Sequence, residues 1–445
     1  MTDAAAFARR ETAPEHATSN GRRILIVAYH FPPEPAAGSL RPSYLARYLP
    51  QFGWEPTVLT KAGNGLDAAT IAAPDILERH KYEHSQKAIP REGRRGFSSR
   101  LRDLAKSMMF FPDRAAGWIP GAIATGLRAA RCRRFDAVLS TGPPHSAHIV
   151  AFAIAQLQRI AWIADYRDLW HASPYGTVKG ELRKSFERRI EAMLRRCAAA
   201  ITAVDHELIM QQERVYGTSF AEVIPAAYDP AEWESVADPE PSGFRLCYAG
   251  TLYGGRRRLD LLLDAIASLR ALAQPAGMAA RVDYYGPDAA LVQQLAEQRG
   301  LGDAVESHGH VGHADVLVAL RRAAVLLIIL DMRQATISRL GSKIFEYIGA
   351  KRPILAIGPT GSAVQHFIAR HRIGWFASDA IEAQAALRAA YKAVANGSAR
   401  RMSNGVGETI LTARDVAARF AALLDVVTAG GQRRTLYRPA KELHR

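Results

Sequence analysis

The chain has 445 residues, of which 48% are hydrophobic and 23% charged, and this composition fits a folded protein of two or three domains. Its net charge of +15 favours nucleic acid, an anionic membrane surface or a highly phosphorylated substrate as a partner. The sequence contains no RNA-binding aromatic motif, zinc finger or basic helix–turn–helix pattern, which argues against nucleic acid. Three widely separated cysteines follow no metal-ligand spacing, so we expect no disulfide framework and a reducing compartment.

Both ends of the chain are predicted to lie outside the folded domains. Residues 1–21 are small and polar, lack the apolar core of a signal peptide, and are predicted to be a disordered tail. Residues 431–445 form a basic tail that need not fold. No stretch approaches the roughly 18 uncharged apolar residues of a membrane-spanning helix. We therefore expect a cytoplasmic protein that does not cross a membrane.

Residues 22–224 are predicted to form a Rossmann-like domain. Short apolar runs typical of buried parallel strands alternate with helical segments and with loops that contain glycine or proline. This rhythm indicates a doubly wound α/β sheet. The expected strands cover residues 22–31, 55–61, 135–141, 159–168 and 198–205, and the expected helices include residues 41–53 and 181–197.

A second Rossmann-like domain is predicted over residues 244–414. The preceding segment, residues 225–243, is rich in proline and acidic residues without a clear period, and it is predicted to be a linker. Residues 415–430 form a final helix that can pack back on the first domain. The expected strands cover residues 244–250, 281–286, 323–330 and 352–358, and the expected helices cover residues 259–273 and 289–301.

Two facing doubly wound domains leave a cleft at the carboxyl ends of their sheets, where such sheets bind ligands. Site residues should therefore follow strands. In the motif "YHFPPEPAAGSLR", Gly38 and Ser39 lie between a strand and a helix, where their amides can approach a phosphate. The alternative is that the glycine only serves the turn.

The motif "YAGTLYGGRRRLD" places three arginines after a strand of the second domain. Guanidinium groups match phosphate oxygens well, so Arg256 and Arg257 are candidate phosphate ligands. A solvated basic surface explains at least one of the three arginines equally well.

The motif "GSKIFEYIGAKRPILAIG" opens an apolar helix with a lysine and a glutamate on one face. Lys343 and Glu346 are three residues apart, and Gly341 and Ser342 lie at the helix start, where free amides attract an anion. Because a carboxylate does not favour a phosphate, its natural partner here is a vicinal diol such as a ribose. A nucleoside diphosphate carries both groups. The alternative is a surface Lys–Glu pair.

Two further motifs, "TGPPHSAHI" and "ADYRDLW", follow strands of the first domain. They offer His145, Asp165, Arg167 and Asp168 as candidates on the acceptor side of the cleft. The alternative is a structural Asp–Arg–Asp ion network.

In combination, these motifs resemble the family 4 retaining glycosyltransferases of the GT-B fold, in which two Rossmann-like domains face each other. The resemblance covers residues 22–430 and is carried by "GSLR", "STGPPHSAH", "ADYRDLW", "YAGTLYGGRR" and "SKIFEYIGAKRPILAIG". The subgroup that the chain looks most like acts in cell-envelope polysaccharide synthesis.

The resemblance implies a nucleotide-sugar donor held mainly by the C-terminal domain and an acceptor held by the N-terminal domain. It implies that Glu346 binds the ribose hydroxyls and that Arg257, with Arg256 adjacent, binds the diphosphate. The sequence departs from the family at Ser338, where a glutamate usually touches the donor sugar, and at Thr251, where an arginine is usual.

Three more residues bear on how the sequence departs from the family. We infer that Lys343 compensates for the arginine that Thr251 replaces, whereas the common Asn–Gly before the linker is replaced by Ala226 and Ala227.

The implied activity is transfer of a sugar, a hexose by similarity, to a lipid-linked or polysaccharide acceptor with retention of stereochemistry. Arg257 and Lys343 are assigned the catalytic role because cations and helix-start amides stabilise the leaving diphosphate in place of a metal ion. Neither a metal nor another cofactor is expected. Two alternatives stay open: a nucleotide-sugar epimerase of the same fold, and a non-catalytic nucleotide-sugar-binding protein.

The basic excess gathers in residues 79–134, which mix arginines with methionines and aromatic residues between Met108 and Trp118. Such a mixture suits peripheral attachment to the inner face of an anionic cell membrane, where a lipid-linked acceptor would lie. The alternative is that the aromatic residues belong to the core and the arginines are merely solvated.

Overall fold

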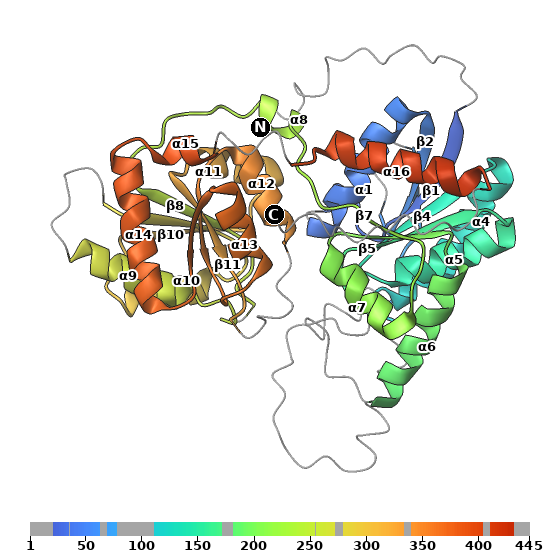
Figure 1. The fold of residues 1–445 in the computed structure, drawn as a ribbon, viewed down its shortest axis with the longest axis horizontal. Coiled ribbons are helices and arrows are strands. Elements are labelled where there is room, and N and C mark those ends of the chain that lie inside the picture. Colours follow the sequence, from blue (N-terminus) through green and yellow to red (C-terminus); the bar gives the residue numbers. More distant parts are fainter. Residues whose placement is uncertain are drawn as a thin grey trace.

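The structure is a computed structural model that describes residues 21–34, 36–62, 69–77, 111–170, 181–253, 255–271, 279–332, 340–403 and 410–430. It consists of two α/β domains that stand side by side, the N-terminal one on the right of Figure 1 and the C-terminal one on the left. Each domain is built on one parallel sheet covered by helices, so the predicted pair of doubly wound domains is confirmed.

The N-terminal sheet has seven parallel strands in the order β3-β2-β1-β4-β5-β6-β7. Its central strands are apolar because helices cover both faces, and Ile24 to Val27 are fully buried. The strands are β1 (Arg22–Val27), β2 (Trp54–Thr60), β3 (Ala69–Ala72), β4 (Ala137–Gly142), β5 (Ala161–Tyr166), β6 (Ala200–Ala203) and β7 (Ala221–Val223). The helices of this domain are α1 (Ala37–Tyr48), α4 (Ile119–Cys132), α5 (Ser146–Gln158), α6 (Glu181–Cys197) and α7 (His206–Tyr216).

The C-terminal sheet has six parallel strands in the order β10-β9-β8-β11-β12-β13. The strands are β8 (Arg245–Ala249), β9 (Arg281–Tyr285), β10 (Val305–Gly309), β11 (Val325–Ile329), β12 (Ile354–Ile357) and β13 (Gly374–Ala377). The helices are α9 (Leu259–Arg270), α10 (Ala289–Glu297), α11 (His313–Arg322), α12 (Ser342–Ala350), α13 (Ala363–His371), α14 (Ala380–Ala395) and α15 (Ala399–Ser403).

The predicted helix over residues 41–53 begins earlier than expected. Helix α1 starts at Ala37 and continues as a 3₁₀ turn over Leu49–Phe52, which ends at Gly53 with a φ of 79°. Gly38 and Ser39 therefore belong to the first turn of the helix instead of the preceding loop. Pro42 is accommodated inside the helix, although it lacks an amide hydrogen.

The chain crosses between the domains at two places that lie side by side. The first crossing contains the short helix α8 (Ala231–Glu234), and the second leads into α16 (Ala413–Thr428). Tyr228 and Thr412 pair in parallel, and the Ala413 amide donates to the Tyr228 carbonyl at 2.8 Å. Helix α16 is capped by Thr412 and packs its apolar face on α1 and on the N-terminal sheet (Figure 1).

A buried ion pair joins the elements at the carboxyl end of the N-terminal sheet. Arg41 on α1 donates from Nε and Nη2 to both carboxylate oxygens of Asp165 on β5, at 2.8 and 2.9 Å. The hydroxyls of Thr141 on β4 and Thr202 on β6 donate to the same carboxylate at 2.8 and 2.7 Å. Four elements therefore meet at one fully buried carboxylate.

The same guanidinium also reaches the domain connection. Arg41 donates to the carbonyls of Ile224 and Pro225 at 2.8 Å each, and it lies 5.0 Å from the centre of the Phe420 ring on α16. All of these donors are used in a dry environment, where hydrogen bonds to charged groups are strong.

Within the described residues, no helix combines the length and the apolar character that crossing a bilayer requires.

We expect Asp165→Asn to lower the free energy of unfolding by about 3–5 kcal/mol, because it leaves the buried Arg41 charge without its counter-ion. Burial acts to raise the pKa of Asp165, but the Arg41 charge and the hydrogen bonds from Arg41, Thr202 and Thr141 outweigh it, so the pKa is lowered. The ionised carboxylate therefore stabilises the fold above its unfolded pKa of about 3.9, and this is lost as the pH falls through the folded pKa.

Urea denaturation at neutral and acidic pH measures both effects. Glu207→Gln is the control, because this exposed carboxylate on α7 pairs only with Gln211 among the contacts of the described chain. An Asp165→Asn protein as stable as the wild type would show that the pair does not hold the domain.

Candidate active site

A cleft of about 780 Å³ lies between the two domains, at the carboxyl ends of both sheets. In each sheet it lies at the point where the strand order reverses, between β1 and β4 and between β8 and β11, as the general rule for such sheets predicts. The residues that line it with polar or backbone groups include His30, Gly38, Arg41, Tyr44, Pro143, Arg167 and Asp168 from one domain, and Tyr248, Gly250, Thr251, Arg257, Asp331, Gly341, Ser342 and Lys343 from the other.

Lys343 lies in the first turn of α12, whose start faces the cleft through Gly341 and Ser342. Its ammonium group is 4.9 Å from the centre of the Tyr248 ring. Burial and the nearby charge of Arg257 together lower the pKa of Lys343 to about 7, although the charge of Glu346 acts in the opposite direction. An anion that enters the cleft would raise the pKa of Lys343 and so favour its charged form.

Gly250 makes room for this lysine. It follows β8 directly, with a φ of 142° that side chains other than glycine rarely adopt. A Cβ atom at this position would overlap the Lys343 ammonium group. The glycine is therefore required both by the backbone turn and by the close approach of Lys343.

Arg257 contacts the hydroxyl group of the same tyrosine, Tyr248. Its Nη1 donates to the Tyr248 hydroxyl at 2.8 Å, and its guanidinium carbon lies 4.8 Å from the centre of the Tyr253 ring. The Tyr248 hydroxyl in turn donates to the Thr251 carbonyl at 3.1 Å. Tyr248 thus places two cations at one end of the cleft, an arrangement suited to a diphosphate.

The two flanking arginines differ from Arg257. Arg258 is turned to Asp260, with which it forms three hydrogen bonds between 2.6 and 2.9 Å. Arg256 is exposed and does not line the cleft, so its predicted role as a diphosphate ligand is not supported by its position. Only one of the three arginines points its charge into the cleft.

Glu346 lies one turn further along α12, outside the residues that line the cleft. Burial raises its pKa, while the charges of His313 and Lys343 act to lower it. The charged and polar groups near Glu346 come from both domains. The Tyr44 hydroxyl of α1 donates to Glu232 of α8 at 3.1 Å, and His313 Nε2 lies 3.7 Å from the carboxylate of Glu232. This polar group of Tyr44, Glu232, His313 and Glu346 borders the cleft at Tyr44.

The wall formed by the N-terminal domain is made mainly by the start of α1 and the end of β5. Gly38 lines the cleft and packs against the Arg167 guanidinium: a Cβ atom on Gly38 would lie 3.3 Å from both terminal nitrogens. His30 and Asp168 complete this wall, and His30 Nδ1 lies 2.9 Å from a carboxylate oxygen of Glu34.

Three predicted site residues are corrected by their positions. Asp165 is fully buried in its network with Arg41, so it does not contact an acceptor. His145 is 6% exposed and stacks on Trp170 with ring centres 5.2 Å apart, so it supports the wall from behind. Ser39 is 3% exposed, and its hydroxyl and amide donate to the carbonyls of Glu34 and Ala36, so neither group is free for a phosphate.

Sequence reasoning missed the two residues that organise the cationic end of the cleft. Tyr248 is fully buried within β8 and was assigned to the strand alone. Strand alternation contains the signal, because Tyr248 and Gly250 are two residues apart and face the same side. Of the departures from the family pattern, Thr251, Ala226 and Ala227 line the cleft, whereas Ser338 lies outside the described residues.

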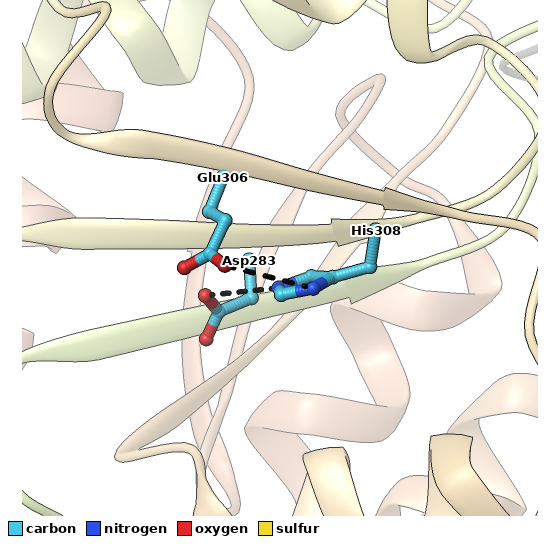
Figure 2. Close-up of side chains that lie close together, drawn as sticks. All are labelled: Asp283, Glu306 and His308. Atoms are coloured by element: carbon cyan, nitrogen blue, oxygen red, sulfur yellow. Dashed lines mark ion pairs between the residues drawn. The ribbon is translucent and has the colours of Figure 1, made fainter.

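A separate cluster of potential metal ligands lies on the C-terminal sheet (Figure 2). Asp283 on β9 and Glu306 and His308 on β10 have ligand atoms within 4.8 Å of one another. Both Asp283 oxygens already accept hydrogen bonds from Arg245 Nη1, at 2.6 and 2.8 Å. Because a metal ion would have to displace this arginine, the cluster is best explained as an ion-pair network.

A family model matches part of the chain, over most of the C-terminal domain. Residues 243–396 match the sequence profile of a family described as "Glycosyl transferases group 1". A search of curated proteins gives no match.

Solved structures match the whole fold. Sucrose-phosphate synthase from Thermosynechococcus elongatus gives a TM-score of 0.66 at 14% identity, over 92% of this chain and 100% of that chain. HepE from Anabaena, in complex with UDP and glucose, gives 0.61 at 13% identity, over 91% and 99%. WaaG, a glycosyltransferase involved in lipopolysaccharide biosynthesis, gives 0.57 at 15% identity, over 90% and 99%. These likenesses confirm the predicted GT-B fold.

We expect the Lys343 ammonium group to titrate near pH 7, and Arg257→Gln to raise its pKa because a neighbouring positive charge is removed. NMR of ¹³C-methylated lysines over a pH series measures this titration. Arg256→Gln, at the exposed position next to Arg257, should leave the titration unchanged. A Lys343 that titrates near the usual lysine value of about 10.4 would contradict the buried site described here.

Proposed function

We propose that this protein is a glycosyltransferase that moves a sugar from a nucleoside diphosphate sugar to an acceptor on the N-terminal wall of the cleft. The observation that carries the proposal is the pair of cations, Arg257 and Lys343, held around Tyr248 inside the cleft. The match of residues 243–396 to group 1 glycosyl transferases supports it, since both cations lie in the matched segment. The complex of the similarly folded HepE with UDP and glucose supports a nucleotide sugar as donor and a hexose as the sugar.

The donor is oriented by three kinds of group. In this proposal the diphosphate binds Arg257, Lys343 and the free amides of Gly341 and Ser342 at the start of α12. In this proposal the ribose hydroxyls donate to the Glu346 carboxylate, which lies one helical turn beyond Lys343. Burial raises the pKa of Glu346, and hydrogen bonds from the ribose would favour its ionised form. Gly38 approaches the donor from the opposite wall without a side chain.

The proposed chemistry follows from where charge develops. Breaking the sugar–phosphate bond leaves negative charge on the diphosphate and positive character on the sugar ring. Arg257 and Lys343 stabilise the leaving group without needing a metal ion, because they are already placed at one end of a partly dry cleft. Retention of stereochemistry is proposed from the resemblance to family 4 glycosyltransferases.

Nucleotide binding tests the site. In a thermal-shift screen of UDP, GDP, ADP and their sugars, we expect one diphosphate to raise the melting temperature. Arg257→Gln and Glu346→Gln should each weaken its binding by about tenfold or more, since each removes charge-assisted hydrogen bonds. Arg370→Gln, an exposed arginine outside the cleft, is the matched control. A screen in which no nucleoside diphosphate binds would refute the donor site.

Turnover tests the reaction. With the donor found in this screen and a panel of lipid-linked and glycan acceptors, we expect transfer that persists in EDTA and a product with the anomeric configuration of the donor, measured by NMR. Conversion of the donor sugar without any acceptor would indicate the epimerase instead, and binding without turnover would indicate a non-catalytic protein.

We further propose that the acceptor is lipid-linked or a polysaccharide and that the protein works at an anionic membrane surface on its cytoplasmic side. The basic segment, residues 79–134, is described only from residue 111 onward. There Trp118 is fully buried and Phe111 packs against Trp170, so these aromatic residues belong to the core and do not form the expected membrane patch.

Helix α6 carries another surface on which exposed apolar side chains lie beside arginines. Phe186 and Met193 are 41% and 42% exposed, and the exposed Arg189 and Arg196 lie on the same side of the helix at spacings of three, four and three residues. Figure 1 shows α6 extending beyond the rest of the N-terminal domain. Apolar side chains beside arginines favour the interface of an anionic bilayer.

We expect the double substitution Phe186→Ser and Met193→Ser to reduce binding to vesicles that contain phosphatidylglycerol, measured by co-sedimentation, while nucleotide binding stays unchanged. Ile381→Ser is the control, because Ile381 is 80% exposed on the C-terminal domain. Equal vesicle binding by the wild type and the double variant would exclude α6 as the contact surface.

A further inference from the structure

Arg167 is a cation in the cleft that forms no ion pair with any described residue, although the charges of Asp165 and Asp168 act on it from nearby. It follows β5 and lines the cleft on the N-terminal wall. Its Nη2 donates to the Pro143 carbonyl, and its Nε is buried without a hydrogen-bond partner. Within the described part of the chain, Arg167 forms no ion pair. A half-buried guanidinium with unused donors is costly unless something binds it.

The acidic residues around Arg167 do not form an ion pair with it. Asp165 is two residues away, but its two oxygens accept from Arg41, Thr141 and Thr202. Asp168 accepts from the Leu169 amide at 2.9 Å and forms no ion pair with Arg167. Burial lowers the pKa of Arg167 to about 10, so the side chain keeps its charge at neutral pH.

The position of Arg167 separates it from the donor's cations. Arg257 and Lys343 belong to the C-terminal domain, where they flank Tyr248. Arg167 belongs to the opposite wall, where its terminal nitrogens pack against Gly38 in the first turn of α1. The dipole of helix α1 adds positive potential at the same place. The N-terminal wall therefore presents its own anion site.

We infer that Arg167 anchors an oxyanion, a phosphate or a carboxylate, that belongs to the acceptor. This inference rests on the proposed function, because it names the chemistry of the second substrate of the same cleft. The planar guanidinium binds two oxygens of such a group at once. A neutral sugar or alcohol would leave the Arg167 guanidinium without an ion-pair partner. The acceptor is thus a phosphorylated or acidic compound, with its reactive hydroxyl directed toward the donor sugar.

Matched probes test the inference. With UDP present at saturation, we would measure by NMR the binding of glucose 6-phosphate, glucuronate and octyl phosphate, and compare each with glucose or octyl glucoside. We expect at least one anionic probe to bind about 10- to 100-fold more tightly than its neutral counterpart. The best probe also identifies the source of the anion: a sugar phosphate, a uronic acid or a lipid phosphate.

The variants assign this preference to one side chain. Arg167→Gln should abolish the preference for the anionic probe and leave UDP affinity within about twofold of the wild type, whereas Arg167→Lys should retain part of it because the charge remains without the planar fork. Arg370→Gln, at an exposed position outside the cleft, should change neither quantity.

Three outcomes would overturn the inference. These are equal binding of anionic and neutral probes, a preference that survives Arg167→Gln, and a loss of UDP affinity in that variant, which would assign Arg167 to the donor. Failure of the proposed function gives a different result, since the wild type would then bind no nucleoside diphosphate at all.

Discussion

The cleft depends on the ion pair between Arg41 and Asp165. A buried carboxylate is stable only when its lone pairs are satisfied, and here the strands on both sides of β5 supply hydroxyl donors while α1 supplies a guanidinium. The pair therefore fixes the start of α1 relative to the ends of β4, β5 and β6. Gly38 and Arg167, which form the N-terminal wall, lie a few residues from its two partners.

The opposite wall follows a different principle. Two basic side chains are held together around Tyr248 before any ligand arrives, and burial together with the Arg257 charge lowers the Lys343 pKa to about 7. Like charges so close together repel each other, and an entering diphosphate relieves that repulsion. Preorganisation of this kind means that little reorganisation is needed when negative charge develops on a leaving group.

Much of the fold is predictable because parallel strands are buried on both faces and appear as short apolar runs. The runs at β1, β4, β8 and β11 were recognised for this reason. The strands that sequence reasoning missed lie at or near the edges of the sheets: β3, β7, β10 and β13 are three to five residues long, and β10 reads "VESHG" with mostly half-exposed side chains. Edge strands contain few buried apolar residues, so they are recognised only from their hydrogen-bonded pairing with a neighbouring strand.

The sequence predicts those site residues whose position follows from the order of strands and helices along the chain. Arg257 lies in the loop after β8 and Lys343 lies in the first turn of α12, and both line the cleft. Asp165 also lies near the end of a strand, but it is still inside β5, where neighbouring strands enclose it, whereas Arg167 lies one residue beyond the strand and reaches the cleft. Such a difference depends on the exact strand boundary, which hydrophobic pattern does not fix.

The paired crossings restrict how the domains can move. Asp229 is held to α1 by Arg47 and Tyr48, whereas Trp233 packs in the core of the C-terminal domain. A pivot in the first connection is thereby confined to the three residues between them. The second connection runs alongside the first through the pairing of Tyr228 with Thr412, so any rotation of one domain against the other would have to pivot at this edge of the cleft. Glu346 interacts electrostatically with Glu232 at the same edge, so such a rotation would displace the opposite edge of the cleft more than the surroundings of Glu346.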